Sequence, residues 1–193
     1  LLLDVMGTSG HALGRIAAVR QDVESLYVAG AGPVGLGVIA MAKARFGSDF
    51  PVYVADLDLW RLEFAESLGA TVDDAAHPSN LTADIAVDTT GAPGARRRAL
   101  DCLAQRGALA LVGHGRRLEL EVSPDLIAPE RAILGSEYFR FDELQPNLNI
   151  LLSTPKRFKQ IITDVLPRSE IKEAFSLFLT GRTGKVVVVE DPS

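Results

Sequence analysis

A glycine-rich turn between an apolar run and a helical pattern is the part of this sequence best suited to chemistry. Residues 25–29 are apolar after Ser25, Gly30, Gly32 and Gly35 follow in the pattern Gly-x-Gly-x-x-Gly, and residues 36–46 have helical periodicity. Each glycine removes a side chain that would obstruct the turn, an approaching phosphate or the packing of the helix. The order strand, turn, helix therefore predicts that the pyrophosphate of a dinucleotide binds at the start of this helix.

An acidic residue closes the next apolar run. Residues 51–55 read Pro-Val-Tyr-Val-Ala, and Asp56 follows them, 21 positions after Gly35 (56 minus 35). A carboxylate at this spacing can accept hydrogen bonds from the ribose hydroxyls of adenosine, and it repels a ribose phosphate. The sequence therefore favours NAD over NADP, although Arg61, one helical turn further on, can soften that preference. Asp56 could instead cap the helix expected to begin near Leu59, because Asp is a good N-cap.

Composition places the chain among globular proteins. It has 193 residues, of which 47% are hydrophobic and 23% charged, and no apolar run approaches the roughly 20 residues that cross a bilayer. The net charge of −5 argues against binding to nucleic acid, which needs a basic face. We therefore expect neither a membrane nor nucleic acid as a partner. Cys102 is the single cysteine, which permits no internal disulfide and fits a cytoplasmic location. Leu1 opens the chain without a Met, which suggests a fragment.

Short apolar runs alternate with amphipathic segments through most of the chain. This pattern predicts strands at 25–29, 51–55, 70–72, 85–87, 108–112 and 132–134, helices at 36–46, 59–68 and 95–105, and an edge hairpin around 118–122. The order predicts an α/β fold with a doubly wound parallel sheet, the Rossmann fold, whose ligand lies at the carboxyl ends of the strands. Residues 141–152 look helical, and 161–166, 169–179 and 185–189 then read as strand, helix and strand without an obvious partner sheet.

Three stretches carry a family resemblance when they are taken together. They are residues 4–13 (DVMGTSGHAL), the turn 30–35 with its Pro33, and ITDVLP at 162–167 followed by EIKEAF at 170–175. In this order they resemble the medium-chain dehydrogenase/reductase family, the zinc-dependent alcohol and polyol dehydrogenases. The likeness covers the whole chain but only the C-terminal half or so of the family's usual polypeptide.

The resemblance implies an upstream GroES-like catalytic domain that holds most of the zinc site and the substrate pocket. The chain would then divide into a helical lead-in from that domain (1–24), an NAD-binding Rossmann domain (25–155), and a strand–helix–strand tail belonging to the missing catalytic domain (156–193). Asp4 falls where the family places the third protein ligand of the catalytic zinc, and a carboxylate oxygen is an acceptable ligand. The Cys and His partners would lie upstream of Leu1. We therefore expect zinc in the parent enzyme and not in this chain.

The resemblance also completes a set of expected cofactor contacts. Thr8 falls near the nicotinamide, several strand ends line the cofactor, and Lys185 falls where the family contacts the pyrophosphate. With the residues of the glycine turn and the acidic strand end, the expected cofactor-binding residues are Thr8, Gly30, Gly32, Pro33, Val34, Gly35, Asp56, Arg61, Thr90, Val112, Gly113, Ser136 and Lys185. No catalytic residue is assigned within this chain.

The resemblance implies that the parent protein transfers a hydride between NAD and a small alcohol or polyol. It also implies that this chain alone binds the cofactor but turns over little. The protein is expected to be a homo-oligomer paired near the sixth strand.

Two other classes of protein stay open. One is a non-catalytic NAD(H)-responsive module. The other is a methyltransferase, which usually has an acidic residue where Ala29 stands. A short-chain reductase is disfavoured, because Asp142 occupies the position four after Tyr138 where a lysine is needed.

Several other polar residues have plainer interpretations. His114, between two glycines, could carry a proton, but the resemblance places it beside the cofactor. His11 is expected to pack on a helix. The run 96–98 of three arginines is expected to form a solvated helix face. Cys102 lies among apolar residues and is expected to be a small buried hydrophobe.

Overall fold

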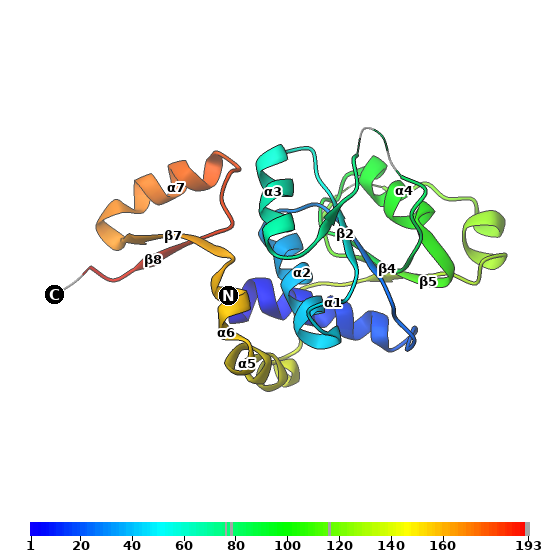
Figure 1. The fold of residues 1–193 in the computed structure, drawn as a ribbon, viewed down its shortest axis with the longest axis horizontal. Helices are drawn as coiled ribbons and strands as arrows, with labels where there is room; N and C mark the ends of the chain where they lie inside the picture. Colours follow the sequence, from blue (N-terminus) through cyan, green and yellow to red (C-terminus); the bar gives the residue numbers. More distant parts are fainter. Residues whose placement is uncertain (76, 78, 116, 192–193) are drawn as a thin grey trace.

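The protein is built on a six-stranded parallel sheet with helices on both faces (Figure 1). The computed structural model describes residues 1–75, 77, 79–115 and 117–191. The strands lie in the order β3-β2-β1-β4-β5-β6, and every neighbouring pair is parallel. Their bounds are β1 Leu26–Ala29, β2 Val52–Ala55, β3 Thr71–Val72, β4 Ala83–Asp88, β5 Leu103–Leu111 and β6 Ala132–Gly135. This is the doubly wound arrangement that the sequence predicts, with the strand order reversing between β1 and β4.

Alternate side chains of the buried strands pack on opposite faces of the sheet. Leu26 and Val28 of β1 join one core cluster, and Tyr27 and Ala29 join the other; all four are at most 2% exposed. The first face is covered by α1 (Gly7–Ala17), α2 (Pro33–Phe46) and α3 (Leu59–Ser67), and the second by α4 (Pro93–Asp101). Because both faces are covered, β1 is apolar and buried at all four positions instead of alternating with polar residues.

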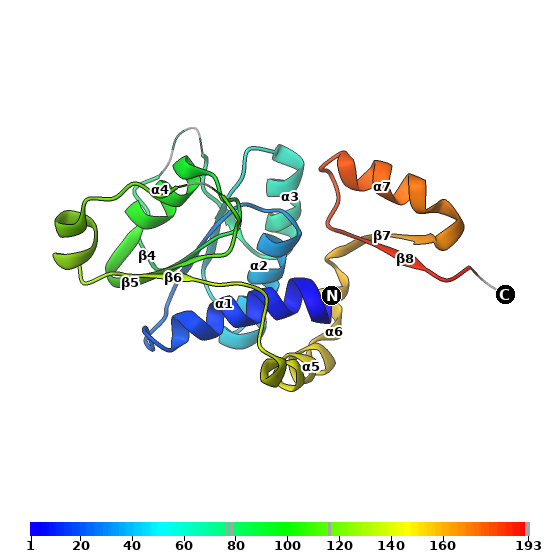
Figure 2. The same ribbon diagram turned by 180° about the vertical axis from the view of Figure 1, so that it is seen from behind.

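The lead-in at the N-terminus is helical over Leu2–Met6 (η1) and α1, and it ends at Ala17. Small residues let α1 pack closely against the C-terminal half of the chain. A Cβ built on Gly7 would meet the ring of Phe139, and one built on Gly10 would meet the side chain of Asn147. His11 is a buried residue of this helix, and its Nδ1 lies 2.9 Å from both carboxylate oxygens of Glu143 in the C-terminal half of the chain. Figure 2, which views the molecule from behind, shows α1 beside α2 and next to α5.

The C-terminal segment forms a second, smaller unit. After η3 (Phe141–Glu143), α5 (Leu144–Ser153) and α6 (Pro155–Lys159), the strand β7 (Ile162–Pro167), the turn η4 (Arg168–Glu170), α7 (Ile171–Leu179) and β8 (Lys185–Val189) follow in order. β8 pairs in parallel with β7. The strand predicted at 185–189, which had no obvious partner sheet, therefore pairs with the strand predicted at 161–166. We call residues 162–189 the C-terminal βαβ unit. Figure 1 shows it projecting beyond α3.

The helix predicted over 95–105 is too long. α4 ends at Asp101, and β5 begins at Leu103, which pairs with Ala83 of β4. β5 is irregular near its start, because the pairing with β4 shifts register between Ala83 and Ile85 and Arg106 has φ 59°. The apolar periodicity of the helix therefore continues into the irregular start of β5, so periodicity alone does not locate the end of the helix.

The edge hairpin predicted around 118–122 is wrong. These residues form no strand, and a π-helical turn, η2 (Ser123–Ile127), follows them before β6. Leu120 packs against the core cluster under α4. The alternation of apolar and polar residues in 118–122 indicates only that one side of the segment is buried. A loop that packs against the protein core buries one side in the same way, without a partner strand.

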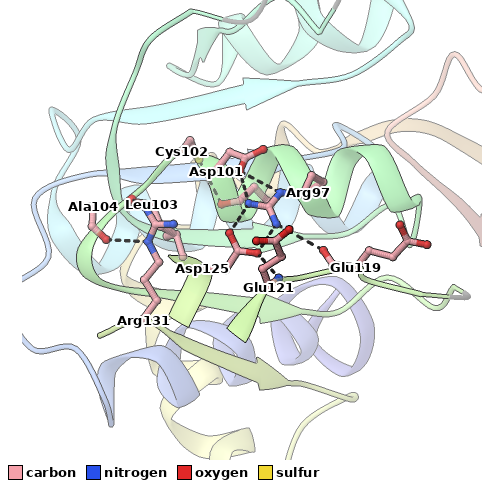
Figure 3. Close-up of polar contacts among 10 residues, drawn as sticks. Arg97, Asp101, Cys102, Leu103, Ala104, Glu119, Glu121, Asp125 and Arg131 are labelled. Carbon is pink, nitrogen blue, oxygen red and sulfur yellow. Dashed lines mark hydrogen bonds and ion pairs between the residues drawn. The ribbon is translucent and has the colours of Figure 1, made fainter. Parts of the chain in front are cut away.

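An arginine of α4 holds this loop in place, as Figure 3 shows. Arg97 Nη1 and Nη2 donate to the two carboxylate oxygens of Asp125 over 2.7 and 2.8 Å, and Nε donates to Asp101 over 2.9 Å. The same Asp125 carboxylate accepts a hydrogen bond from the backbone N–H of Glu121 over 2.7 Å. Arg97 is therefore a structural anchor and not part of a solvated face.

Across the described part of the chain, no helix is long and apolar enough to cross a bilayer.

Candidate functional site

A cavity of about 1140 Å³ opens at the carboxyl ends of β1, β2 and β4, where the strand order reverses. Its walls come from the glycine turn, the end of β2, the β4–α4 connection and the turn after α7. Its volume exceeds that of typical small-molecule pockets, about 300–1,000 Å³, so it can hold a ligand of dinucleotide size. It is lined by Tyr27, Ala29, Gly30, Gly32, Pro33, Val34, Ala55, Asp56, Leu57, Asp58, Arg61, Ala75, Thr89, Thr90, Ala92, Gly94, Ala95, Arg98, Thr180 and Gly181.

The three glycines of the turn have three different surroundings. Gly30 has φ +94°, and a Cβ on it would lie 2.7 Å from Thr89 Oγ1 and 2.7 Å from Thr90 Cγ2. A Cβ on Gly35 would meet the carbonyl of Gly30, so this glycine allows α2 to pack on the turn. Gly32 differs, because the nearest atom to its Cβ would be 3.9 Å away and the space beside it is the cavity. The absence of a side chain at Gly32 therefore leaves space in the cavity for a ligand, whereas at Gly30 and Gly35 it leaves space for neighbouring protein atoms.

The first turn of α2 faces the cavity. Gly32 is the N-cap residue, Pro33 occupies the first helical turn, and Pro33 and Val34 line the cavity. A proline is well suited to this position, because its missing N–H would have no partner within the helix. The N–H groups and the dipole at a helix N-terminus favour negative charge. The cavity wall therefore provides a setting for a phosphate group.

Asp56 lies on the cavity wall and ties the end of β2 to the glycine turn. Its Oδ2 accepts a hydrogen bond from Ala31 N–H over 2.7 Å, and its Oδ1 accepts from the N–H groups of Leu57 (2.8 Å) and Asp58 (3.0 Å). A carboxylate offers about four acceptor positions, so a further donor can be accommodated. The N-cap of α3 is Asp58, which accepts from Arg61 N–H over 3.2 Å. The alternative that Asp56 caps this helix is wrong.

Arg61 lies at the rim of the cavity, between the strand end and the C-terminal βαβ unit. Its Nη1 is 3.8 Å from Asp56 Oδ2, and its Nε donates a hydrogen bond to the carbonyl of Gly181 over 2.9 Å. The side chain is 31% exposed. The sequence is compatible with Arg61 as a solvated helix residue or as an adenosine contact, and it does not indicate a partner near the end of the chain.

A buried ion pair shapes the far wall, and sequence reasoning missed it. The carboxylate of Asp88, which is fully buried, accepts hydrogen bonds from Thr90 N–H (2.9 Å) and Thr90 Oγ1 (2.6 Å) and pairs with Arg96 Nε at 3.0 Å. Arg96 Nη2 also donates to the carbonyl of Gly113 over 2.5 Å. The network fixes Thr90 on the cavity wall. An acidic residue at the end of a buried strand was the available signal, because such a charge requires a partner.

The third arginine of α4 also reaches a specific partner. Arg98 Nη2 donates to Asp73 over 2.9 Å and to the Ser79 carbonyl over 2.7 Å, and its guanidinium lies 5.7 Å from the centre of the Tyr27 ring. Burial raises the pKa of Tyr27 to about 12, so its hydroxyl stays neutral on the cavity wall. The expectation of a solvated face at 96–98 is therefore wrong at all three positions, because each guanidinium meets a carboxylate from another segment.

Not all predicted cofactor residues lie on the cavity. Thr8 is buried in α1, Gly35 supports the turn, and Val112 lies just beyond β5. A Cβ on Gly113 would meet the backbone of Gly91 and Thr89, so this position serves close packing. Ser136 follows β6, and its buried Oγ has no hydrogen-bond partner within the described residues. That hydroxyl retains the capacity to bond a polar group from outside this chain or a ligand.

Lys185 and Asp4 meet each other instead of the cavity. The ammonium of Lys185 forms an ion pair with the carboxylate of Asp4. Within the ranges that the structure covers, no group of three or more His, Cys, Asp and Glu side chains could hold a metal ion. Asp4 therefore offers a single ligand, and the residues described here do not fit a zinc site by themselves.

Two further residues have the surroundings of ordinary structural groups. Cys102 is 2% exposed, and burial raises the pKa of its thiol to about 12, which confirms the expectation of a buried small hydrophobe. The side chain of His114 is 84% exposed and lies 3.5 Å from Glu137, and it does not line the cavity.

Comparison with known proteins gives a consistent assignment. The family model "Zinc-binding dehydrogenase" matches residues 33–153. An L-threonine 3-dehydrogenase of Saccharopolyspora erythraea is 27% identical over 201 aligned positions, covering 97% of this chain and 56% of that protein. An uncharacterized zinc-type alcohol dehydrogenase-like protein of Escherichia coli is 28% identical, over 86% of this chain and 49% of its own length. The chain therefore spans about half the length of the curated relatives it matches.

Solved structures show the same fold. The 2R,3R-butanediol dehydrogenase of Bacillus subtilis matches with a TM-score of 0.86 at 22% identity, over 98% of this chain and 57% of that one. The glucose dehydrogenase of Haloferax mediterranei, solved in complex with NADP, Zn and gluconolactone, matches with a TM-score of 0.83 at 23% identity, over 100% of this chain and 59% of that one. The matched family model covers more than half of the chain, including the start of α2, the end of β2 and the β4–α4 connection. The chain accordingly belongs to the zinc-binding dehydrogenase family.

Proposed function

We propose that this chain is the NAD-binding portion of a dehydrogenase that acts on an alcohol or polyol. The observation that carries the proposal is the pairing of Gly32, which leaves the cavity open at the N-terminus of α2, with the Asp56 carboxylate beside it. A pyrophosphate would lie against Gly32, Pro33 and Val34, and the adenosine ribose hydroxyls would donate to Asp56.

The same geometry favours NAD over NADP. The Asp56 carboxylate is already fixed by three backbone N–H groups and would repel a ribose 2′-phosphate. Arg61 is the nearby cation, and its contacts to Asp56 and Gly181 leave it partly engaged. The side chain of Leu57 is 94% exposed at the cavity wall and offers an apolar surface for the flat adenine base.

The bound cofactor supplies hydride transfer at its nicotinamide ring. The residues of this chain would bind and orient it: the α2 N-terminus would face the phosphates, Asp56 would face the ribose, and Thr90 and Ser136, at strand ends, would lie toward the nicotinamide. In the parent enzyme Asp4 would be one zinc ligand, with its partners supplied by residues upstream of Leu1. This chain alone would bind the cofactor and turn over little.

The remaining parts of the proposal concern the parent protein. Residues 25–155 would form the cofactor domain, while 1–24 and 156–193 would connect to an upstream catalytic domain. The exposed side chains of Phe175, Phe178 and Leu179 on α7 would be covered by that domain. We expect a cytoplasmic homo-oligomer that pairs near β6, which is an edge strand of the sheet, and that binds neither membrane nor nucleic acid.

An NADH titration of this chain, followed by energy transfer from its single tryptophan, tests the proposal. Trp60 adjoins Arg61 at the start of α3 and stacks on Phe64, with ring centroids 5.2 Å apart. NADH should quench Trp60 emission saturably and with one-to-one stoichiometry, more tightly than NADPH. Metal analysis of the same sample should find less than about a tenth of an equivalent of zinc, because one carboxylate does not hold the ion. Absence of saturable quenching, or stoichiometric zinc, would contradict the proposal.

A further inference from the structure

The turn that follows α7 lies on the wall of the cavity although it belongs to the far end of the chain. Thr180 and Gly181 both line the cavity. Gly181 has φ +72°, in the left-handed region that favours glycine. The Thr180 hydroxyl donates to the Leu177 carbonyl over 2.6 Å and accepts from Arg182 N–H over 3.2 Å. The turn is therefore fixed by its own hydrogen bonds before any ligand arrives.

Arg61 is the side chain that meets this turn. Its Nε donates to the Gly181 carbonyl over 2.9 Å, across 120 positions of sequence. A Cβ on Gly181 would lie 3.2 Å from Arg61 Nη2, and a Cβ on Gly32 would lie 3.9 Å from Nη1. With Asp56 Oδ2 3.8 Å from Nη1, the guanidinium stands between the glycine turn, the ribose-binding carboxylate and the C-terminal turn.

This contact lies where the C-terminal βαβ unit meets the nucleotide-binding part of the chain. The unit projects beyond α3 (Figure 1), and the hydrogen bond from Arg61 to Gly181 and the ion pair of Lys185 with Asp4 both join it to the remainder. The first of these links lies on the cavity wall. A ligand in the adenosine end of the cavity would therefore touch both sides of the junction.

We propose that the Thr180–Gly181 turn forms part of the dinucleotide site at its adenosine end, and that Arg61 is the positioning residue that holds it there. The inference rests on the proposed function. It assigns a cofactor role to a segment that the family resemblance led us to expect in contact with a catalytic domain. It also means that occupation of the adenosine end is coupled to the seating of the C-terminal βαβ unit, whereas occupation of the nicotinamide end is not.

A double-mutant cycle with ADP-ribose tests the inference on the whole chain. The four proteins are the wild type, Arg61→Met, Gly181→Ala and the double variant, each titrated by calorimetry. Arg61→Met removes the donor, and Gly181→Ala strains the turn at φ +72° and crowds Arg61 Nη2. Each single change should weaken ADP-ribose binding about tenfold, the scale of a charge-assisted hydrogen bond, and the double variant should be no weaker than the weaker single variant.

Two controls separate this coupling from general effects. Arg182→Met removes an exposed cation from the same turn and should leave ADP-ribose affinity within about twofold, since exposed charges contribute little. Nicotinamide mononucleotide, which lacks the adenosine half, should bind all variants alike. If Gly181→Ala lowers the melting temperature strongly, Thr180→Ala, which removes the hydroxyl that fixes the turn, replaces it in the cycle.

The results of these titrations distinguish failure of the inference from failure of the proposed cofactor function. If Gly181→Ala binds ADP-ribose as the wild type does, or if the two effects multiply, Arg61 acts without the turn and the inference is wrong. If the wild type binds no ADP-ribose at all, it is the proposed cofactor function that fails.

Discussion

The carboxylate of Asp56 accepts a hydrogen bond from the backbone N–H of Ala31 over 2.7 Å, which joins the end of β2 to the glycine turn at the end of β1. The two residues are 25 positions apart in the sequence. The contact holds the acidic side chain on the cavity wall, where a ribose would lie, and it orients the turn on which a pyrophosphate would rest.

Replacement of Asp56 by Asn should weaken NADH binding by about tenfold or more, because the carboxylate that we propose as the acceptor for the ribose hydroxyls loses its charge. NADPH should lose less, since the repulsion of its phosphate also disappears, so the ratio of the two affinities should move toward one. Fluorescence titrations with both cofactors measure this ratio. Glu63→Gln removes the same charge from an exposed position of α3 and should leave the ratio unchanged. A ratio unaltered in Asp56→Asn would show that the carboxylate does not face the ribose.

Gly32→Ala and Gly35→Ala should fail in different ways. A Cβ on Gly32 meets no protein atom closer than 3.9 Å and enters the cavity, so this variant should melt like the wild type but bind NADH about tenfold more weakly. A Cβ on Gly35 collides with the Gly30 carbonyl, so that variant should lose stability as well. Thermal melts and titrations of both variants check the pair. Normal NADH binding by Gly32→Ala would mean that the space beside Gly32 is not the cofactor site.

Arg96→Met should destabilise the fold by about 3 kcal/mol, because it leaves the buried Asp88 carboxylate without its cation. The free energy of unfolding in urea measures this change. Arg117→Met breaks an exposed pair with Glu119 and should change the same quantity by less than about 1 kcal/mol. Equal effects of the two variants would show that the Asp88–Arg96 pair is not what fixes the β4–α4 connection.

Stability should depend on pH through Asp125. The ion pair with Arg97 lowers the pKa of this carboxyl from 3.8 to about 2 in the folded protein. Because the folded pKa is depressed, the stabilisation is complete above about pH 4 and is lost as the pH falls toward 2. Asp125→Asn should therefore lower the urea midpoint at pH 6 and flatten its decline below pH 4. Asp22→Asn, at an exposed position, should reproduce the wild-type curve, and a steep acid decline in Asp125→Asn would rule out this assignment.

The elements that the sequence predicts well are those whose pattern reports local burial. Helices cover both faces of the sheet at β1, so the four residues of this strand are all apolar. The glycines that follow the strand indicate the turn. The three arginines of α4 show the limit of this reasoning. Their partners, Asp88, Asp125 and Asp73, lie on other segments, and no periodicity in the sequence states which carboxylate approaches which guanidinium.

The candidate site divides in the same way. Gly32, Asp56 and Thr90 could be predicted because strand ends and a spacing rule place them at one edge of the sheet. The approach of Gly181 to Arg61 could not, because it depends on where the C-terminal βαβ unit packs, and local pattern carries no information on that. The ion pair of Lys185 with Asp4 likewise joins two distant segments, and no local pattern in the sequence indicates it.

A crystal structure of this chain with NADH tests the central claim most directly. We predict that the pyrophosphate lies against the N-terminus of α2 beside Gly32, with the adenosine ribose hydroxyls within hydrogen-bond distance of Asp56. Cofactor bound elsewhere, or an Asp56 carboxylate turned away from the ribose, would contradict the account.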